Sequence, residues 1–70
     1  MVKLKTFFLN GQKYKIDQNI TLLELLDYFN YNLNLLVIEH NKLIRKKQNW
    51  HRIIINDNDI IEIVTIVGGG

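Results

Sequence analysis

The sequence predicts one α+β domain, with a mixed sheet of about four to five strands and one main helix packed on one face. Three observations predict it: an Asn-Gly pair between two strand-like segments, a single amphipathic stretch with a helix-start signal, and a long β-branched segment near the end of the chain. Seventy residues are enough for one domain only. With 47% hydrophobic residues, the chain can still build a real core.

The first two strands form a hairpin. Residues 2–9, VKLKTFFL, are rich in β-branched and aromatic side chains, which is typical of a strand. The alternation shifts phase at Phe7 and Phe8, so the sequence does not say which aromatic side chain faces the core. Asn10-Gly11 predicts a tight turn because both residue types tolerate positive φ. Residues 12–17 then return as the second strand.

A helix is predicted over residues 22–30. Thr21 and Glu24 have the spacing of a capping box, in which the two side chains satisfy free backbone amides at a helix start. Ile20 precedes the cap and forms a hydrophobic staple with the fourth helical residue. The apolar residues that recur at helical spacing are Leu22, Leu25, Leu26 and Phe29. Residues 30–32 have a turn composition and end the helix.

The second half of the chain reads as strands and turns. Residues 35–39, LLVIE, consist of an apolar run that ends in a glutamate and predict a central strand, and residues 43–44 predict a short extension. Another short strand is expected within residues 51–55, and a turn at residues 57–59. Residues 60–67 are rich in β-branched residues and predict the last strand.

This order of elements favours the ubiquitin-like β-grasp arrangement. A hairpin, a helix crossing one sheet face and a final long strand make an α+β domain in which the first strand, in the middle of the sheet, pairs with the last. The expected domain covers residues 1–67. Residues 68–70 are expected to form a flexible glycine tail.

Several kinds of catalytic and metal site are excluded or unsupported. The chain has no cysteine, hence no disulfide or thiolate chemistry, and no serine for a serine triad. His40 and His51 lack metal-ligand spacing, so each is expected to be an exposed or half-packed loop histidine. Asp57 and Asp59 lack the glycine and glutamate of a calcium loop. The sequence therefore predicts no metal and no catalytic residue of its own.

Charge and hydropathy bear on partners. The net charge of +2 is a weak excess for a nucleic-acid binder. The basic cluster Lys42, Arg45, Lys46, Lys47 and Arg52 fits a solvated loop, a docking patch for a partner or, less well, RNA binding. The opening residues lack the apolar region of a signal peptide, and no run approaches the roughly 18 apolar residues of a membrane span. Neither nucleic acid nor membrane is an expected partner.

The abundance of Asn, Ile and Lys, which have AT-rich codons, suggests a plastid or a low-GC bacterial genome. The expected location is therefore the cytoplasm, or the plastid stroma if the gene lies in a plastid genome.

The end of the chain holds the strongest functional signal. Gly68, Gly69 and Gly70 are three of only four glycines and follow directly on the last strand. A tail without side chains fits a narrow channel in another protein, and three extended residues reach on the order of 10 Å. The reactive group would be the α-carboxylate of Gly70, which a partner would have to activate, and ATP is the expected source of the activating group.

Nearly the whole chain resembles the ThiS family of sulfur carriers. The similar segments are the NGQ hairpin, the TLLELL helix start, VIEHNKLIR, Trp50 and DNDIIEIVTIVGGG, which ends in three glycines where many relatives end in two. The resemblance implies that a ThiF-type enzyme adenylates Gly70 with MgATP and that a sulfur donor such as a cysteine desulfurase converts it to a thiocarboxylate. The sulfur would then pass to the thiazole synthase ThiG in thiamine biosynthesis. All catalytic residues and the MgATP site would belong to the partners.

The docking surface is expected on the last strand. Ile61 and Ile63 alternate with Glu62 and Val64, so the side that carries Glu62 should face solvent. Val64 and Ile66 would then be exposed near the tail, where an apolar docking patch belongs.

Three further residues are assigned around this surface. Phe7 or Phe8 would extend the patch, depending on the phase of the first strand. Arg45 is a further docking candidate, although a structural role comes first for Arg45 and for Trp50, which is expected to pack a loop onto the domain.

Three other functions stay open. A β-grasp carrier could serve molybdopterin synthesis or tRNA thiolation, although such proteins are usually longer. A ubiquitin-like modifier would join Gly70 to lysines through isopeptide bonds. A plain nucleic-acid-binding module would bind in a salt-dependent way and would not need the tail.

Overall fold

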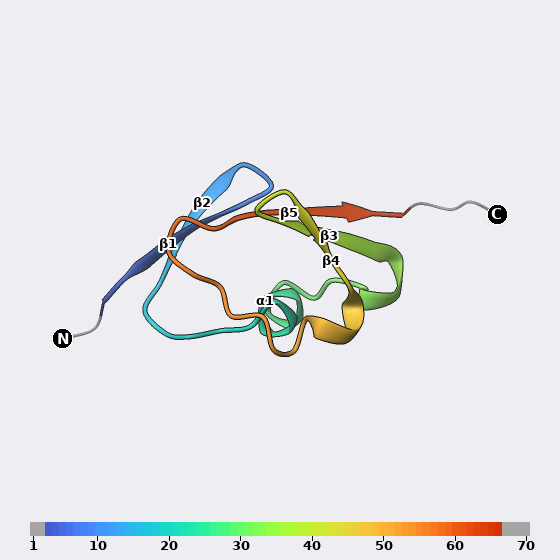
Figure 1. The fold of residues 1–70 in the computed structure, drawn as a ribbon, viewed down its shortest axis with the longest axis horizontal. Helices are drawn as coiled ribbons and strands as arrows, with labels where there is room; N and C mark the ends of the chain where they lie inside the picture. The colour runs from blue at the N-terminus through green and yellow to red at the C-terminus, as the bar shows by residue number, and fades with distance from the viewer. Residues whose placement is uncertain (1–2, 67–70) are drawn as a thin grey trace.

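In the described part of the chain, five strands form one mixed sheet, and one α-helix crosses one of its faces (Figure 1). The computed structural model describes residues 3–66. Its strands and α-helix are β1 (Lys5–Leu9), β2 (Gln12–Ile16), α1 (Leu22–Tyr28), β3 (Leu36–His40), β4 (Leu43–Arg45) and β5 (Ile60–Thr65), with short 3-10 helices at Leu33–Leu35 and Lys47–Asn49. The strand order is β2-β1-β5-β3-β4, and β1 pairs in parallel with β5. The predicted α+β architecture, with the first strand inside the sheet and paired to the last, is confirmed.

The first hairpin forms at the predicted Asn-Gly pair. Asn10 has φ 50° and Gly11 has φ 83°, as a two-residue turn between antiparallel strands requires. β1 begins at Lys5 rather than at residue 2, and β2 ends at Ile16, one residue before the prediction. Residues 1–2 lie outside the part that the structure describes.

The capping box at the start of α1 is confirmed. The Glu24 amide donates to Thr21 Oγ1 (3.1 Å), and the Thr21 amide donates to Glu24 Oε1 (2.9 Å). The helix ends at Tyr28, two residues earlier than predicted, because Asn30 adopts φ 58°. The Asn30 amide donates to the Asp27 carbonyl (3.1 Å) and the Tyr31 amide to the Leu26 carbonyl (3.1 Å). These bonds are those of a Schellman motif with asparagine in the left-handed position.

A second tight hairpin joins β3 to β4. Asn41 (φ 51°) and Lys42 (φ 69°) both adopt positive φ, and β4 turns back antiparallel to β3. The prediction of a β-strand within residues 51–55 is wrong. That segment makes only an isolated bridge between Ile54 and Thr21, because its backbone bonds to the residues around the helix start rather than to the sheet.

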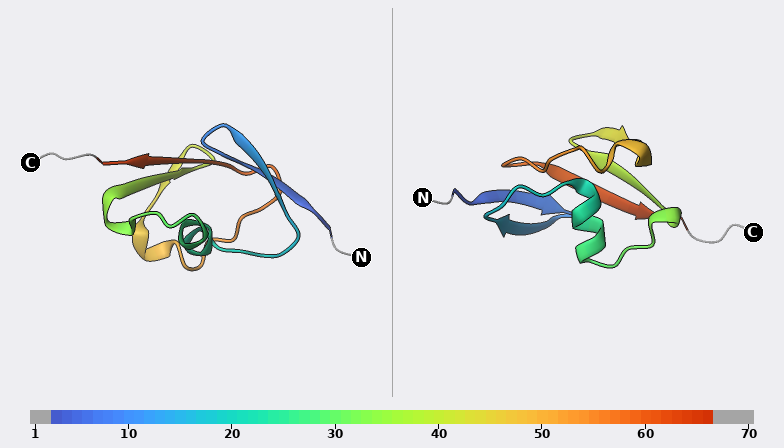
Figure 2. Two further views of the ribbon diagram at one scale, coloured as in Figure 1. Left: turned by 180° about the vertical axis from the view of Figure 1, so that it is seen from behind. Right: turned by 90° about the horizontal axis from the view of Figure 1, so that it is seen from below.

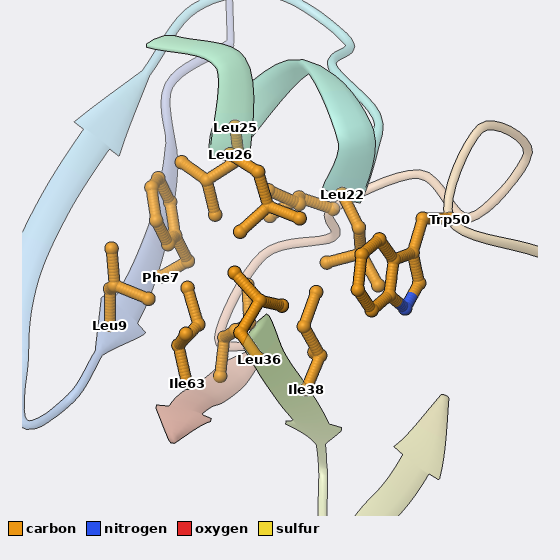
Figure 3. Packing of buried hydrophobic residues seen from close by; sticks show 11 residues of the cluster. Phe7, Leu9, Leu22, Leu25, Leu26, Leu36, Ile38, Trp50 and Ile63 are labelled. Atoms are coloured by element: carbon orange, nitrogen blue, oxygen red, sulfur yellow. The ribbon is translucent and has the colours of Figure 1, made fainter. Parts of the chain in front are cut away.

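The core lies between α1 and the inner face of the sheet. Figure 3 shows side chains from the helix meeting those of β1, β3 and β5, with the indole of Trp50 closing one side. Trp50 is 2% exposed and donates from Nε1 to the Arg45 carbonyl (2.9 Å), so the prediction that it packs a loop onto the domain is confirmed. Phe7 is 1% exposed and packs in this core, which settles the phase of β1: Phe8 points to the other face.

Candidate functional site

The strand that leads to the glycines pairs with β1 at its first two residues and with β3 from Ile61 to Thr65. β5 lies between β1 and β3 in the sheet and ends at the opposite end of the domain from the start of β1 (Figure 1). Beyond the strand, the Ile66 amide still donates to the Leu35 carbonyl (2.6 Å). Gly68, Gly69 and Gly70 lie outside residues 3–66, so their role as a tail stays a prediction from the sequence. Backbone hydrogen bonds therefore hold the chain in place up to Ile66.

A buried polar network fixes the start of β5. Asp59 Oδ2 lies 2.7 Å from His40 Nε2 and accepts the Asn56 amide (2.7 Å), while Asp59 Oδ1 accepts from Asn41 Nδ2 (2.9 Å). Asn41 Oδ1 in turn accepts the amide of Ile60, the first residue of β5 (2.8 Å). The network therefore joins the β3–β4 turn to the point where β5 begins.

His40 is not the exposed or half-packed loop histidine that the sequence suggested. It is the last residue of β3, it is 4% exposed, and Arg45 Nε donates to its Nδ1 (3.3 Å). This arrangement assigns the proton of a neutral ring to Nε2, where it faces Asp59. Sequence reasoning missed the role because the partners of His40 come from the β3–β4 hairpin and from the turn before β5.

The network also sets the ionisation of Asp59. Burial alone would raise the pKa of this carboxyl. The hydrogen bonds from the Asn56 amide, Asn41 and His40 outweigh burial and hold the pKa of Asp59 below its usual value. The carboxylate is thus a charged acceptor at the centre of a structural site, and the side chain of Arg45 belongs to the same site.

The other face of the sheet carries an exposed surface, here called the outer sheet face. α1 and the segment after β4 lie on the inner side (Figures 1 and 2). The register places the following side chains together on the outer sheet face: Phe8, Val37, Glu39, Ile44, Ile60, Glu62 and Val64. The exposure predicted for Glu62, Val64 and Ile66 is confirmed.

The structure changes the membership of the expected patch. Phe7 is in the core and does not extend it, whereas half-buried Phe8 lies beside Ile60 on the outer sheet face. Sequence reasoning missed Ile60, although the alternation along β5 already indicated it. It also missed Ile44 and Glu39, which reach this face through the β3–β4 register.

A concave surface lies elsewhere, at the hairpin end of the domain. Its volume is about 540 Å³, and it lies between the β1–β2 hairpin and α1, with Tyr14, Tyr28 and Phe29 among its walls. Tyr14 stacks on Phe7 with ring centroids 5.6 Å apart.

Over residues 3–66, no three His, Asp or Glu side chains are grouped to hold a metal ion. No helix in that range has the length and apolarity needed to cross a membrane.

Comparison with known families gives a direct result. The sequence model of the ThiS family matches residues 6–70. The chain belongs to the ThiS family. The match spans the fold described above and also the three glycines that follow it.

One relative of the chain is named as a member of this family, and another is uncharacterized. The chain is 39% identical over 64 residues to the sulfur carrier protein ThiS of Bacillus subtilis, covering 89% of this chain and 96% of that protein. It is 58% identical over 66 residues to the uncharacterized protein ycf40 of Trieres chinensis, covering 94% and 90%.

Solved structures show the same fold. A crystal structure of the thiamine biosynthesis protein ThiS from Geobacter metallireducens superposes with a TM-score of 0.79 at 20% identity, covering 93% of this chain and 99% of that one. The predicted β-grasp fold is confirmed. The family and the fold together support a sulfur-carrier role, in which a small protein serves enzymes and is not itself the catalyst.

Proposed function

We propose that this protein carries sulfur on the α-carboxylate of Gly70 for the synthesis of the thiamine thiazole. A ThiF-type enzyme joins the carboxylate to the AMP part of MgATP and releases pyrophosphate. The outer sulfur of a persulfide on a donor such as a cysteine desulfurase attacks the activated carbonyl and displaces AMP. A thiol then reduces the resulting acyl disulfide, and the thiocarboxylate that is released delivers its sulfur to the thiazole synthase ThiG. The observation that carries the proposal is the ThiS family match, which includes Gly68, Gly69 and Gly70.

The chemistry explains why the protein needs no catalytic residue of its own. A carboxylate is a poor electrophile until it carries a good leaving group, and AMP is such a group. The partner enzyme binds MgATP, so the carrier supplies only the terminal group and a surface that places it. Glycines suit the approach to an enclosed active site because they have no side chains.

The fold supports this division of labour. β5 pairs with β1 at its start and with β3 up to its end, and its first residue is hydrogen-bonded to the Asp59 network through Asn41. The outer sheet face includes β5 itself, so an enzyme docked there would lie beside the strand that leads to Gly70. We assign this face to partner docking, with Glu62, Val64 and neighbouring Ile66 as its part nearest the glycines.

Relatives named ycf40 support a location in the plastid, since ycf names denote reading frames of plastid genomes. Such names are carried by the proteins of Trieres chinensis and Porphyra purpurea. The partners would then be enzymes that act in the plastid stroma.

The test is the mass of the intact protein after incubation with a ThiF-type enzyme, MgATP and a sulfur donor. We expect a gain that matches replacement of one oxygen by sulfur, absent without ATP and absent when Gly70 is deleted. The matched control is Thr65→Ser, which keeps the tail. No gain, with the enzymes shown to charge the Bacillus subtilis relative, would refute the proposal. Adducts with other proteins at lysine would favour a ubiquitin-like modifier instead.

A further inference from the structure

Two carboxylates face each other at the centre of the outer sheet face. Glu39 on β3 and Glu62 on β5 are directly paired in the antiparallel register, so both side chains leave the sheet on the same side. Side chains paired in this way have Cβ atoms about 4.5–5.5 Å apart, and like charges at this spacing destabilise a sheet. Within residues 3–66, neither glutamate has a side-chain hydrogen bond or an ion pair. The fold itself gains nothing from this pair.

The surroundings of the pair are apolar. Ile44 continues the same row onto β4 and is 70% exposed, and the next row consists of Val37 and Val64, the latter 61% exposed. Ile60 lies on the other side of Glu62 along β5. A partner that covers these aliphatic side chains also removes water from both carboxylates, which is costly unless it brings an opposite charge.

We propose that the outer sheet face docks on a protein surface that places one arginine or lysine side chain between Glu39 and Glu62. Apolar side chains around that cation would cover Ile44, Ile60 and Val64. Arginine fits best, since its planar guanidinium can bond two carboxylates at once. This inference rests on the proposed function, because the partner is the activating enzyme that must reach Gly70.

The charge of the pair argues against other occupants of this face. A second copy of the chain, docked face to face, would add two more carboxylates to a desolvated centre that already holds two. A nucleic acid would place phosphates against the same pair. β2 contributes Lys13 and Lys15 to this side of the sheet. They do not pair with the two glutamates, because β1 lies between β2 and β5. The complementary surface is therefore a protein with a basic side chain in an apolar setting.

The test compares charging kinetics of four variants with those of the wild type. The variants are Glu39→Gln, Glu62→Gln, the double variant and the control Asp27→Asn, which removes the same charge from the exposed surface of α1. The enzyme is the ThiF-type protein that charges the Bacillus subtilis relative. We expect each glutamine to raise the KM for the carrier about tenfold and the double variant more, with kcat at saturation unchanged. The difference should shrink as salt is added.

The outcomes separate this inference from the proposed function. If the wild type is charged and the glutamine variants match Asp27→Asn, the inference is overturned and the carrier function stands. If the wild type is not charged, the carrier function falls, and the inference falls with it. A dimer that Val64→Ser dissociates would show a second copy on this face and would also overturn the inference. Thermal unfolding checks the fold, and Glu62→Gln should melt no lower than the wild type because a repulsion has been removed.

Discussion

Replacing Asp59 by asparagine should lower the free energy of unfolding by about 2–3 kcal/mol. Asp59 accepts three hydrogen bonds, from His40, Asn41 and the Asn56 amide. Asparagine has one acceptor oxygen. If this oxygen takes the Oδ2 position, the bonds from His40 and the Asn56 amide are kept. The new NH₂ group then faces Nδ2 of Asn41, so that two donors oppose each other.

Asn41 cannot relieve that conflict by turning its amide over. Its Oδ1 accepts the Ile60 amide at 2.8 Å, and a flip would break that bond at the start of β5. One buried donor is therefore left without an acceptor, which costs about 1–3 kcal/mol. The bond from His40 also loses its charged acceptor, and such bonds are roughly twice as strong as neutral ones.

The loss should depend on pH. Because the folded state holds the pKa of Asp59 below its usual value, ionised Asp59 stabilises the fold. That contribution is fully present above the pKa of the unfolded chain, about 3.9, and is lost as the pH falls through the lower folded-state pKa. The difference between wild type and Asp59→Asn should therefore narrow below about pH 4.

Urea unfolding followed by tryptophan fluorescence measures both effects, since Trp50 is the only tryptophan and is buried. With a slope near 1 kcal/mol per molar urea for so small a domain, the urea midpoint at pH 7 should fall by about 2–3 M. Asp27→Asn is the control and should stay within about 0.5 kcal/mol of the wild type. A shift below about 0.5 M, or a difference that is the same at pH 7 and pH 3, would refute the reasoning.

Three further substitutions can be measured by the same unfolding assay. Thr21→Ala removes the side-chain half of the capping box and should cost about 1 kcal/mol; an unchanged midpoint would mean that the cap adds nothing. Leu26→Ala should cost about 2–5 kcal/mol, because Leu26 is fully buried between α1 and the sheet. Glu62→Gln should stabilise the free protein by about 0.2–1 kcal/mol, and a lower midpoint would contradict the repulsion assigned to Glu39 and Glu62.

Local signals in the sequence were enough for the turns and the helix start. Asn10-Gly11 specifies its hairpin through backbone conformation alone, and the Thr21–Glu24 box acts over a single turn of helix. The end of α1 was less visible, because an asparagine at residue 30 closes a Schellman motif only when the following chain supplies the second amide.

Two features that depend on contacts between distant residues were not predicted, although the pairing of β1 with β5 was. Segment 51–55 has strand-like side chains, yet its backbone finds partners next to the helix start instead of an open sheet edge. The burial of His40 depends on Asp59, 19 residues away.

The outer sheet face likewise contains some residues that the sequence of one strand predicts and others that it does not. The alternation of side chains along β5 was sufficient to predict that Glu62 and Val64 are exposed. Glu39 and Ile44 joined them only through the register of β3 with its two neighbours. A register is set by contacts across the whole sheet, so a reading of one strand at a time misses it.

The most direct test of the carrier function is the fate of labelled sulfur. The protein is first charged with labelled sulfur at Gly70, purified, and incubated with thiazole synthase and its other substrates. We predict that the label appears in the thiazole phosphate and leaves the carrier in equal amount. Label that stays on the carrier, while the same synthase accepts sulfur from the charged Bacillus subtilis relative, would contradict a role in thiazole synthesis.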